Sequence, residues 1–154
     1  MNSEVILIVA GEPNSVFSEI LFKTLNKVNC KKPIVLICSN ELFKIQKKKL
    51  NFKKKIKLIN YKKLNELNLD NKSINLINVE YTQKKAFQKI SSRSSKYIEN
   101  CFKIAFKLIN KEKITRFING PVSKKHFLKK KHLGITEYIS KQFSIKKTCM
   151  LIFN

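Results

Sequence analysis

The chain has 154 residues, of which 43% are hydrophobic and 28% are charged, and this is the composition of one ordinary globular domain. It excludes a disordered or collagen-like chain, and no stretch approaches the roughly 18 consecutive apolar residues that a membrane-spanning helix requires. Residues 1–9 contain Glu4 and no basic side chain, unlike a secretory signal peptide. We therefore expect a soluble cytoplasmic protein that has no membrane partner.

The formal net charge of +23 would ordinarily indicate a nucleic-acid or anionic-membrane partner. However, only Arg93 and Arg116 are arginines, whereas proteins that contact phosphates and base edges favour the bidentate arginine fork. The excess of Lys, together with Ile and Asn, is typical of drift in an AT-rich genome, and we interpret most lysines as solvated surface. A nucleic-acid partner is therefore not expected.

The first part of the chain alternates between strand and helix patterns. The continuous apolar run 5–10 predicts a strand buried on both faces, and from Ser15 onward the apolar side chains recur at helical spacing. A second apolar run, 34–38, predicts another strand, and a short helix begins after it with Ser39 or Asn40 as its cap.

The middle of the chain carries weaker signals. We expect a weak strand around 56–59 and a loop over the Asn-rich residues 62–72. Residues 74–81 alternate imperfectly between apolar and polar side chains, which predicts one irregular strand of the kind found at a sheet edge. The serine cluster in 91–95 marks the next boundary.

The last part of the chain contains the clearest helix. Apolar residues at helical spacing predict a helix over 95–111, followed by a short strand at 115–118. One further helix is expected to begin near 122–123 and another near Thr136, and the apolar run 148–153 predicts a final strand.

This alternation predicts an α/β fold, with a mostly parallel sheet and helices on both of its faces. Ligands of such folds usually bind beyond the carboxyl ends of the strands, which makes the turns 11–15 and 119–124 the most important. Both turns place backbone N–H groups at a helix N-terminus, and the second adds Ser123, Lys124 and Lys125, which suit an anionic or phosphorylated ligand. The alternative is structural: Gly and Pro shape tight turns, and Ser123 caps a helix.

The cysteines and histidines do not predict a catalytic or metal site. The four cysteines form no C-x-x-C pair, and we interpret them as reduced, buried, apolar residues, with a catalytic thiol as the less favoured alternative. The two histidines have no carboxylate partner in register and are expected at the surface. These residues are Cys30, Cys38, Cys101, Cys149, His126 and His132.

Three short blocks of residues, each at a turn or a helix start, follow one another along the chain. They are Gly11-Glu12-Pro13 with Glu19-Ile20, Gly120-Pro121-Val122 with Lys124, and Gly134 with Thr136-Glu137. In these blocks, and in the spacing of the second and third, the chain resembles the 4-hydroxythreonine-4-phosphate dehydrogenase family, the NAD-dependent enzymes of pyridoxal phosphate biosynthesis.

The resemblance implies an isocitrate/isopropylmalate dehydrogenase-like fold and a reaction. The family oxidises and decarboxylates 4-phosphooxy-L-threonine, a phosphorylated small molecule, on the route to pyridoxine 5'-phosphate (vitamin B6). It uses NAD and a divalent metal (zinc, magnesium or cobalt) and acts as a homodimer. Among the residues of this chain, the resemblance implies substrate contact by Thr136, in a pocket shaped by Gly120 and Lys124. It assigns no catalytic, cofactor-binding or metal-binding residue here.

The chain departs from the family pattern in two blocks and in length. Residues 14–18 are Asn-Ser-Val-Phe-Ser where family members usually have Ala-Gly-Ile-Gly-Pro, and Ile135 stands where the family has a substrate-binding histidine. The family continues through another half, which supplies the metal-binding histidines, further basic residues and most of the NAD site. We therefore expect residues 1–154 to be a single α/β unit, the truncated N-terminal part of a longer two-domain enzyme, inactive alone.

Two other interpretations remain open. The first is a small basic protein that binds nucleic acid or an anionic surface without catalysis, because residues 44–63 hold ten lysines and no acid. Against it stands the lack of any aromatic-interleaved RNA-binding motif. The second is a decayed, inactive paralogue, which Ile135 and the altered turn at 14–18 would explain.

Overall fold

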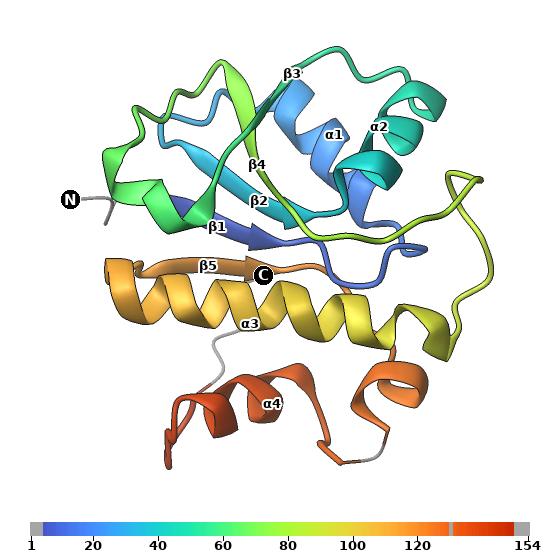
Figure 1. Ribbon diagram of the computed structural model, residues 1–154. Helices are drawn as coiled ribbons and strands as arrows, with labels where there is room; N and C mark the ends of the chain where they lie inside the picture. The colour runs from blue at the N-terminus through green and yellow to red at the C-terminus, as the bar shows by residue number, and fades with distance from the viewer. Residues whose placement is uncertain (1–4, 130, 150–154) are drawn as a thin grey trace.

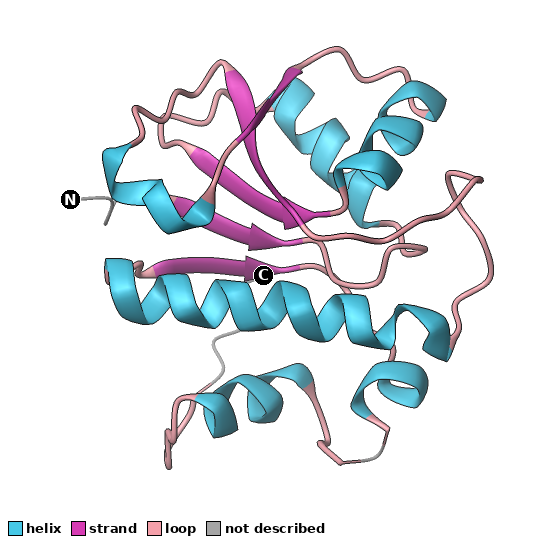
Figure 2. Ribbon diagram, viewed as in Figure 1, coloured by secondary structure: helices cyan, strands magenta, loops and turns pink. Residues whose placement is uncertain are grey.

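Five parallel strands form the central sheet of the protein. The structure, a computed structural model, describes residues 5–129 and 131–149, without the side chains of residues 65–66. The strand order is β3-β4-β2-β1-β5, and every neighbouring pair is parallel (Figures 1 and 2). The strands are β1 (Ile6–Val9), β2 (Ile34–Cys38), β3 (Lys55–Leu58), β4 (Ser73–Asn78) and β5 (Arg116–Asn119).

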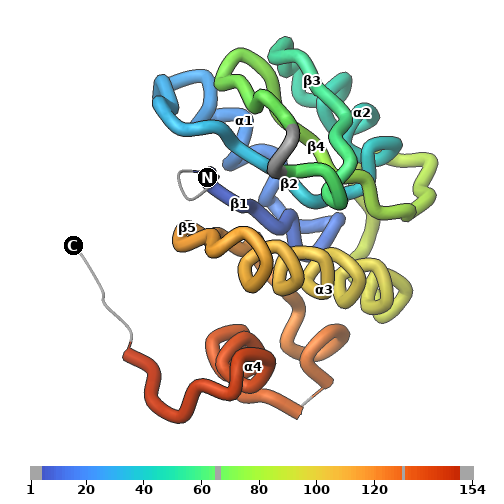
Figure 3. Tube along the Cα trace, turned by 60° about the vertical axis from the view of Figure 1, so that its left-hand side comes forward, coloured from blue at the N-terminus to red at the C-terminus, as the bar shows by residue number. Residues whose placement is uncertain are grey.

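Helices cover both faces of the sheet, as expected. Helices α1 and α2 pack on one face and α3 on the other, with α4 on the side of α3 away from the sheet (Figures 1 and 3). None of the described helices is long and apolar enough to cross a membrane. The helices are α1 (Phe17–Lys27), α2 (Asn40–Lys49), α3 (Ser95–Glu112) and α4 (Ile135–Gln142), and the short turns are η1 (Tyr61–Glu66), η2 (Ser92–Ser94) and η3 (Lys124–Leu128).

Alternating side chains of the strands divide the core into two layers. On β1, Leu7 and Val9 face α3, whereas Ile8 faces α1, and all three are buried. Helix α3 presents Phe102, which is fully buried and stacks on Phe127 of η3 with ring centroids 5.9 Å apart. The apolar stripe of α3 therefore joins the sheet on one side to the segment η3–α4 on the other.

Strand β4 lies inside the sheet, so the prediction of an edge strand at 74–81 was wrong. Residues 74–77 are all buried, and the pairing ends at Asn78. The polar residue that disturbs the apolar pattern is Asn75, whose side-chain amide donates hydrogen bonds to the carbonyl oxygens of Ile34, at 3.0 Å, and Asp70, at 3.1 Å. In the sequence, a polar residue that is buried and bonded to the backbone cannot be distinguished from one that faces solvent.

The remaining boundaries differ from the expectations in detail. β3 begins one residue before the predicted 56–59, and part of the predicted loop 62–72 forms η1. Residues 148–149 are not in a strand, and the rest of the strand predicted at 148–153 lies outside the described residues.

The four cysteines are free thiols with different environments. Cys38 and Cys101 are buried, as expected, whereas Cys30 is half-buried and Cys149 is exposed, so the prediction of burial was wrong for Cys149. Burial raises the pKa of Cys101 to about 12. Burial, with Cys101 as a neighbour, also raises the pKa of Cys38 well above its usual value. Neither buried thiol is therefore available as a thiolate nucleophile near neutral pH.

We expect the four thiols to react with iodoacetamide at distinct rates in the folded protein. Cys149 should be alkylated first and Cys30 more slowly, because reaction requires an accessible thiolate. Cys38 and Cys101 should react only after unfolding in denaturant, which peptide mass spectrometry would show. Alkylation of Cys38 at the rate of Cys149 in the native protein would contradict the burial described here.

Candidate functional site

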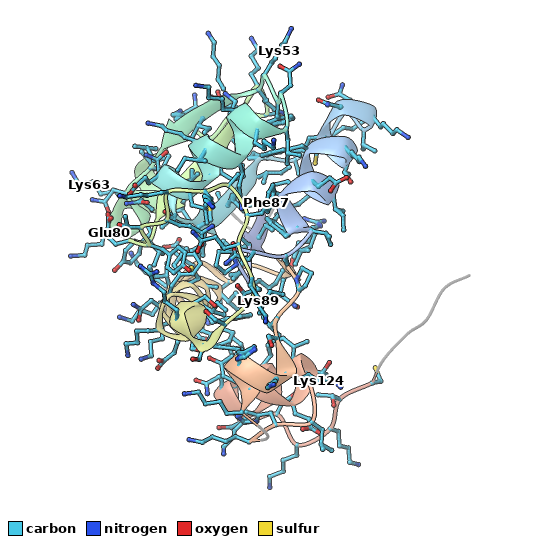
Figure 4. The ribbon with its side chains drawn as sticks, turned by 90° about the vertical axis from the view of Figure 1, so that its right-hand side faces the viewer. Lys53, Lys63, Glu80, Phe87, Lys89 and Lys124 are labelled. Carbon is cyan, nitrogen blue, oxygen red and sulfur yellow. The ribbon has the colours of Figure 1, made fainter. Side chains whose placement is uncertain are left out.

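The carboxyl edge of the sheet has a point at which the strand order reverses. The chain leaves β1 toward β2 on one side, and it later returns across the sheet to place β5 on the other side of β1. In open parallel sheets, ligands bind at the carboxyl ends of the strands at such a reversal. The turns that follow β1 and β5 meet here, and Figure 4 looks onto this edge.

The two turns are joined through their backbones. The N–H of Gly120 donates to the carbonyl oxygen of Val9 at 2.7 Å, and the N–H of Glu12 donates to the carbonyl oxygen of Pro121 at 2.8 Å. A Cβ on Gly120 would lie 2.1 Å from the carbonyl oxygen of Ala10. Gly11 has a φ of +72°, and a Cβ there would lie 2.4 Å from the Pro121 oxygen. Both glycines are therefore required for this close approach.

A buried carboxylate ties the first turn to the start of α3. Glu12 is 2% exposed, and its Oε2 accepts a hydrogen bond from the Ser94 hydroxyl at 2.8 Å. Its Oε1 accepts from the N–H of Asn14 at 3.3 Å. Glu12 belongs to the first of the three blocks, but the sequence predicts no role for it. The available signal was an acidic residue between Gly11 and Pro13, directly after a fully apolar strand.

The segment 79–91 closes over the first turn. The side-chain oxygen of Asn14 accepts hydrogen bonds from the amide of Gln83 at 2.9 Å and from the N–H of Gln88 at 2.8 Å. The amide of Gln46 donates to the carbonyl oxygens of Pro13, at 2.8 Å, and Ala86, at 3.0 Å. The cavity beneath this turn measures about 10 Å³, which is room for about one water molecule. The first turn is thus a closed structural element with no space for a larger ligand.

The second turn leads into η3 and leaves a cation exposed. The Ser123 hydroxyl accepts a hydrogen bond from the N–H of His126 at 3.2 Å, so Ser123 caps η3, as the structural alternative proposed. The Ser95 hydroxyl donates to the carbonyl oxygen of His126 at 2.9 Å, which fastens η3 to the start of α3. Lys124 is exposed at the carboxyl edge (Figure 4), and it forms no ion pair within the described part of the chain.

The third block forms the start of α4. Gly134 is the N-cap, and Glu137 Oε2 accepts a hydrogen bond from the N–H of Leu133 at 2.7 Å. Thr136 is therefore the second residue of the helix and does not cap it. Its hydroxyl has no hydrogen-bond partner among the described residues, and the side chain is half-buried. Ile135, at the position of the family histidine, packs against the core cluster that contains α3.

The predicted substrate residues lie on three consecutive elements. Gly120 is buried at the end of β5, Lys124 begins η3, and Thr136 lies in the first turn of α4. The histidines expected at the surface are half-buried, and the ring of His132 meets that of Tyr138 edge-on at 5.4 Å. Substrate contact by Gly120, Lys124 and Thr136 stays a prediction.

A basic cleft of about 550 Å³ lies between α3 and α4, and none of Gly120, Lys124 and Thr136 lines it. Two of its lysines share one carboxylate, which offsets one of their two positive charges: Glu99 lies 2.6 Å from the Lys103 amine and 3.3 Å from that of Lys96. The hydrogen bond from Lys103, with a further one from Lys96, lowers the pKa of Glu99. The cleft is therefore less suited to bind an anion than its lysine content indicates.

The described residues form neither a site for the divalent metal nor a site for the dinucleotide that the family resemblance implies. Within 5–129 and 131–149, no three His, Cys, Asp or Glu side chains come together as a metal-ligand set. The turn after β1, where α/β folds often hold a dinucleotide pyrophosphate, is closed by its contacts with Pro121 and Gln46.

We expect the substitution Gly120→Ala to lower the free energy of unfolding by at least about 3 kcal/mol, the upper end for overpacking, because its Cβ would overlap the Ala10 carbonyl. The matched control is Gly134→Ala, since a Cβ at Gly134 meets nothing within 4 Å and should cost less than about 1 kcal/mol. Urea denaturation followed by circular dichroism measures both. Equal losses for the two variants would show that the turns do not meet as described.

Comparison with known proteins gives one family. The model of the family described as pyridoxal phosphate biosynthetic protein PdxA matches residues 29–154. The comparison with curated protein sequences gives no match.

Solved structures named as 4-hydroxythreonine-4-phosphate dehydrogenases share the fold. The structure from Burkholderia phymatum has a TM-score of 0.76 and 20% identity, over 94% of this chain. The structure from Klebsiella pneumoniae has a TM-score of 0.75 and 17% identity, over 90% of this chain. A putative 4-hydroxythreonine-4-phosphate dehydrogenase from Salmonella typhimurium has a TM-score of 0.73 and 21% identity, also over 90% of this chain. This chain spans 44% of the length of each. The match of the family model, supported by this shared fold, shows that the chain belongs to the PdxA family of pyridoxal phosphate biosynthetic proteins.

Proposed function

We propose that this chain is the N-terminal part of an NAD-dependent 4-hydroxythreonine-4-phosphate dehydrogenase. The reaction is the oxidation and decarboxylation of 4-phosphooxy-L-threonine in pyridoxine 5'-phosphate (vitamin B6) biosynthesis. The observation that carries the proposal is the family match over residues 29–154, which includes β5, η3 and α4. The names of the solved structures that share the fold support the same reaction.

The chemistry of the second and third blocks suits a phosphorylated substrate. Lys124 offers an ammonium group that has no carboxylate partner in the described residues, and Thr136 offers a hydroxyl without a hydrogen bond there. Each lies in the first turn of a helical segment, where backbone N–H groups point outward and favour an anion. Gly120 would act indirectly, by fixing the turn that leads to Lys124.

In this proposal the redox and metal chemistry belongs to residues outside the described ones. The described residues hold no metal-ligand set and no open dinucleotide turn, so neither NAD nor the divalent metal (zinc, magnesium or cobalt) is assigned to them. We therefore infer that the chain by itself binds substrate but does not turn it over. The full-length form would be a cytoplasmic homodimer.

A second candidate is a basic binding protein without catalysis. The observation that favours it is a hollow of about 630 Å³ between α2 and β3, into which four lysines of the acid-free segment 44–63 project. Binding of nucleic acid there would weaken steeply with salt and show no sequence preference. The family match favours the dehydrogenase.

We expect calorimetric titration of the chain with 4-phosphooxy-L-threonine to show binding that Lys124→Gln weakens about tenfold, the effect of losing one charge-assisted hydrogen bond of about 1.4 kcal/mol. Lys125→Gln is the matched control, because Lys125 is also exposed and adjacent but lies outside the family's blocks. It should leave the affinity unchanged.

Two outcomes would contradict this proposal. Equal loss in the two lysine variants would indicate general charge attraction, as in the second candidate. No binding by the unaltered chain would favour the decayed paralogue, in which Ile135 has replaced a ligand contact by core packing.

A further inference from the structure

The glycine that the second turn requires directly follows an asparagine. The chain has three glycines, and only Gly120 comes after an asparagine, Asn119. A glycine nitrogen meets no side chain of its own residue when it approaches the preceding one, and glycine adopts backbone conformations that other residues avoid. An Asn-Gly dipeptide is for these reasons the sequence in which asparagine most readily loses its side-chain amide. The backbone contact of Gly120 with Val9 and of Glu12 with Pro121, here called the clamp, thus contains a chemically labile dipeptide.

The reaction of such a dipeptide is an intramolecular substitution. The Gly120 nitrogen bonds to the side-chain carbonyl carbon of Asn119, and the side-chain nitrogen leaves as ammonia with the proton from Gly120, so that a succinimide ring remains. Water then opens the ring at either of its two carbonyl groups. Opening at the side-chain carbonyl leaves aspartate, whereas opening at the main-chain carbonyl leaves isoaspartate, whose backbone is longer by a methylene group.

The clamp opposes the first step of this reaction. The ring closes only when the peptide after Asn119 rotates until its nitrogen lies on the side of the Asn119 Cβ, and Asn119 is the last residue of β5, where the backbone is extended. The N–H of Gly120 donates to the carbonyl oxygen of Val9 at 2.7 Å, so this rotation would break the hydrogen bond. Gly120 is also buried against the carbonyl oxygen of Ala10, which leaves no room for the rotation.

The Asn119 side chain is held by the same turn. Its Nδ2 donates to the carbonyl oxygen of Gly120 at 3.1 Å, although the side chain is only half-buried. The protection therefore comes from the conformation of the turn more than from exclusion of water. Strand β5 pairs only with β1 among the described strands, at the border of the sheet (Figure 1). Local opening of this border would release Gly120 from Val9 while the other strands stay paired.

We propose that Asn119 is a deamidation site that the closed clamp keeps unreactive, and that the isoaspartate formed in an opened chain prevents the clamp from closing again. The added methylene group would shift Gly120 relative to Val9, and Gly120 has no space in which to shift, because a Cβ there would already lie 2.1 Å from the Ala10 carbonyl oxygen. The proposal concerns the turn alone and needs no assumption about the reaction of the enzyme, so the substrate titration and this proposal can fail independently.

The first test compares the rate of deamidation in the native and the unfolded chain. Trypsin, which cleaves after Arg and Lys, releases residues 117–124 as a peptide whose only asparagine is Asn119. Mass spectrometry of this peptide, after incubation of the chain in mildly alkaline buffer with or without guanidinium chloride, gives both rates. We expect deamidation to be at least about a hundredfold slower in the native chain, because it proceeds only through the small fraction that is open. Equal rates, or a peptide that stays unmodified in denaturant, would overturn the proposal.

The second test measures whether the modified chain folds. After incubation in denaturant with a reducing agent, the circular dichroism recovered on dilution should fall in step with the isoaspartate content of residues 117–124. Asn119→Gln, which would have to close a larger ring, and Asn119→Ser, which has no amide to lose, should recover equally well at all times. Asn110→Gln is the matched control, because Asn110 is exposed near the end of α3 and is followed by Lys111, and it should lose recovery as the unaltered chain does.

Two outcomes of the refolding test would overturn the proposal. Full recovery of chains that contain isoaspartate at position 119 would show that the clamp tolerates the longer backbone. Loss of recovery in both Asn119 variants at the rate of the unaltered chain would show that damage elsewhere in the chain prevents refolding.

Discussion

The backbone contact between the turns that follow β1 and β5 positions every other feature of the carboxyl edge. The backbone N–H of Gly120 donates to the carbonyl oxygen of Val9, and that of Glu12 donates to the carbonyl oxygen of Pro121. Neither Gly11 nor Gly120 has space for a side chain. The start of α3 then holds both turns, through Ser94 on the first and Ser95 on the helix after the second. Because η3 is fastened to this point, the exposed Lys124 at its first position is held near the start of α3.

The departures from the family pattern acquire structural explanations at this contact. Asn14 holds the segment 79–91 over the first turn through two hydrogen bonds, so a turn that has lost two glycines is closed and well packed. The ring of Phe17 lies 2.7 Å from the position that a Cβ on Gly120 would take. Ile135 packs on the core, where the family has a histidine. Asn14 thus contributes hydrogen bonds, and Ile135 contributes packing.

The sequence predicted those parts of the fold that depend on local periodicity. Local periodicity predicts β1 and β2 from their apolar runs and α3 from its apolar stripe. The alternation of strands and helices along the chain then predicts a parallel sheet. The position of β4 could not be predicted, because the partners of Asn75 are backbone carbonyls 41 and 5 residues away. The role of Glu12 depends on Ser94, 82 residues later in the chain. Hydrogen bonds between residues so far apart leave no local pattern, so the sequence indicates candidate residues for the site but not the interactions that hold their elements in place.

In the proposed function, the clamped carboxyl edge presents the second and third blocks to a phosphorylated substrate. The most direct measurement is an NMR titration of the isotope-labelled chain with 4-phosphooxy-L-threonine, followed through the backbone amides. We expect shifts at the amides of residues 120, 122–124 and 135–137, while the amides of α3 beside the basic cleft stay unchanged. Shifts confined to that cleft, or spread evenly over the lysine-rich surface, would contradict it.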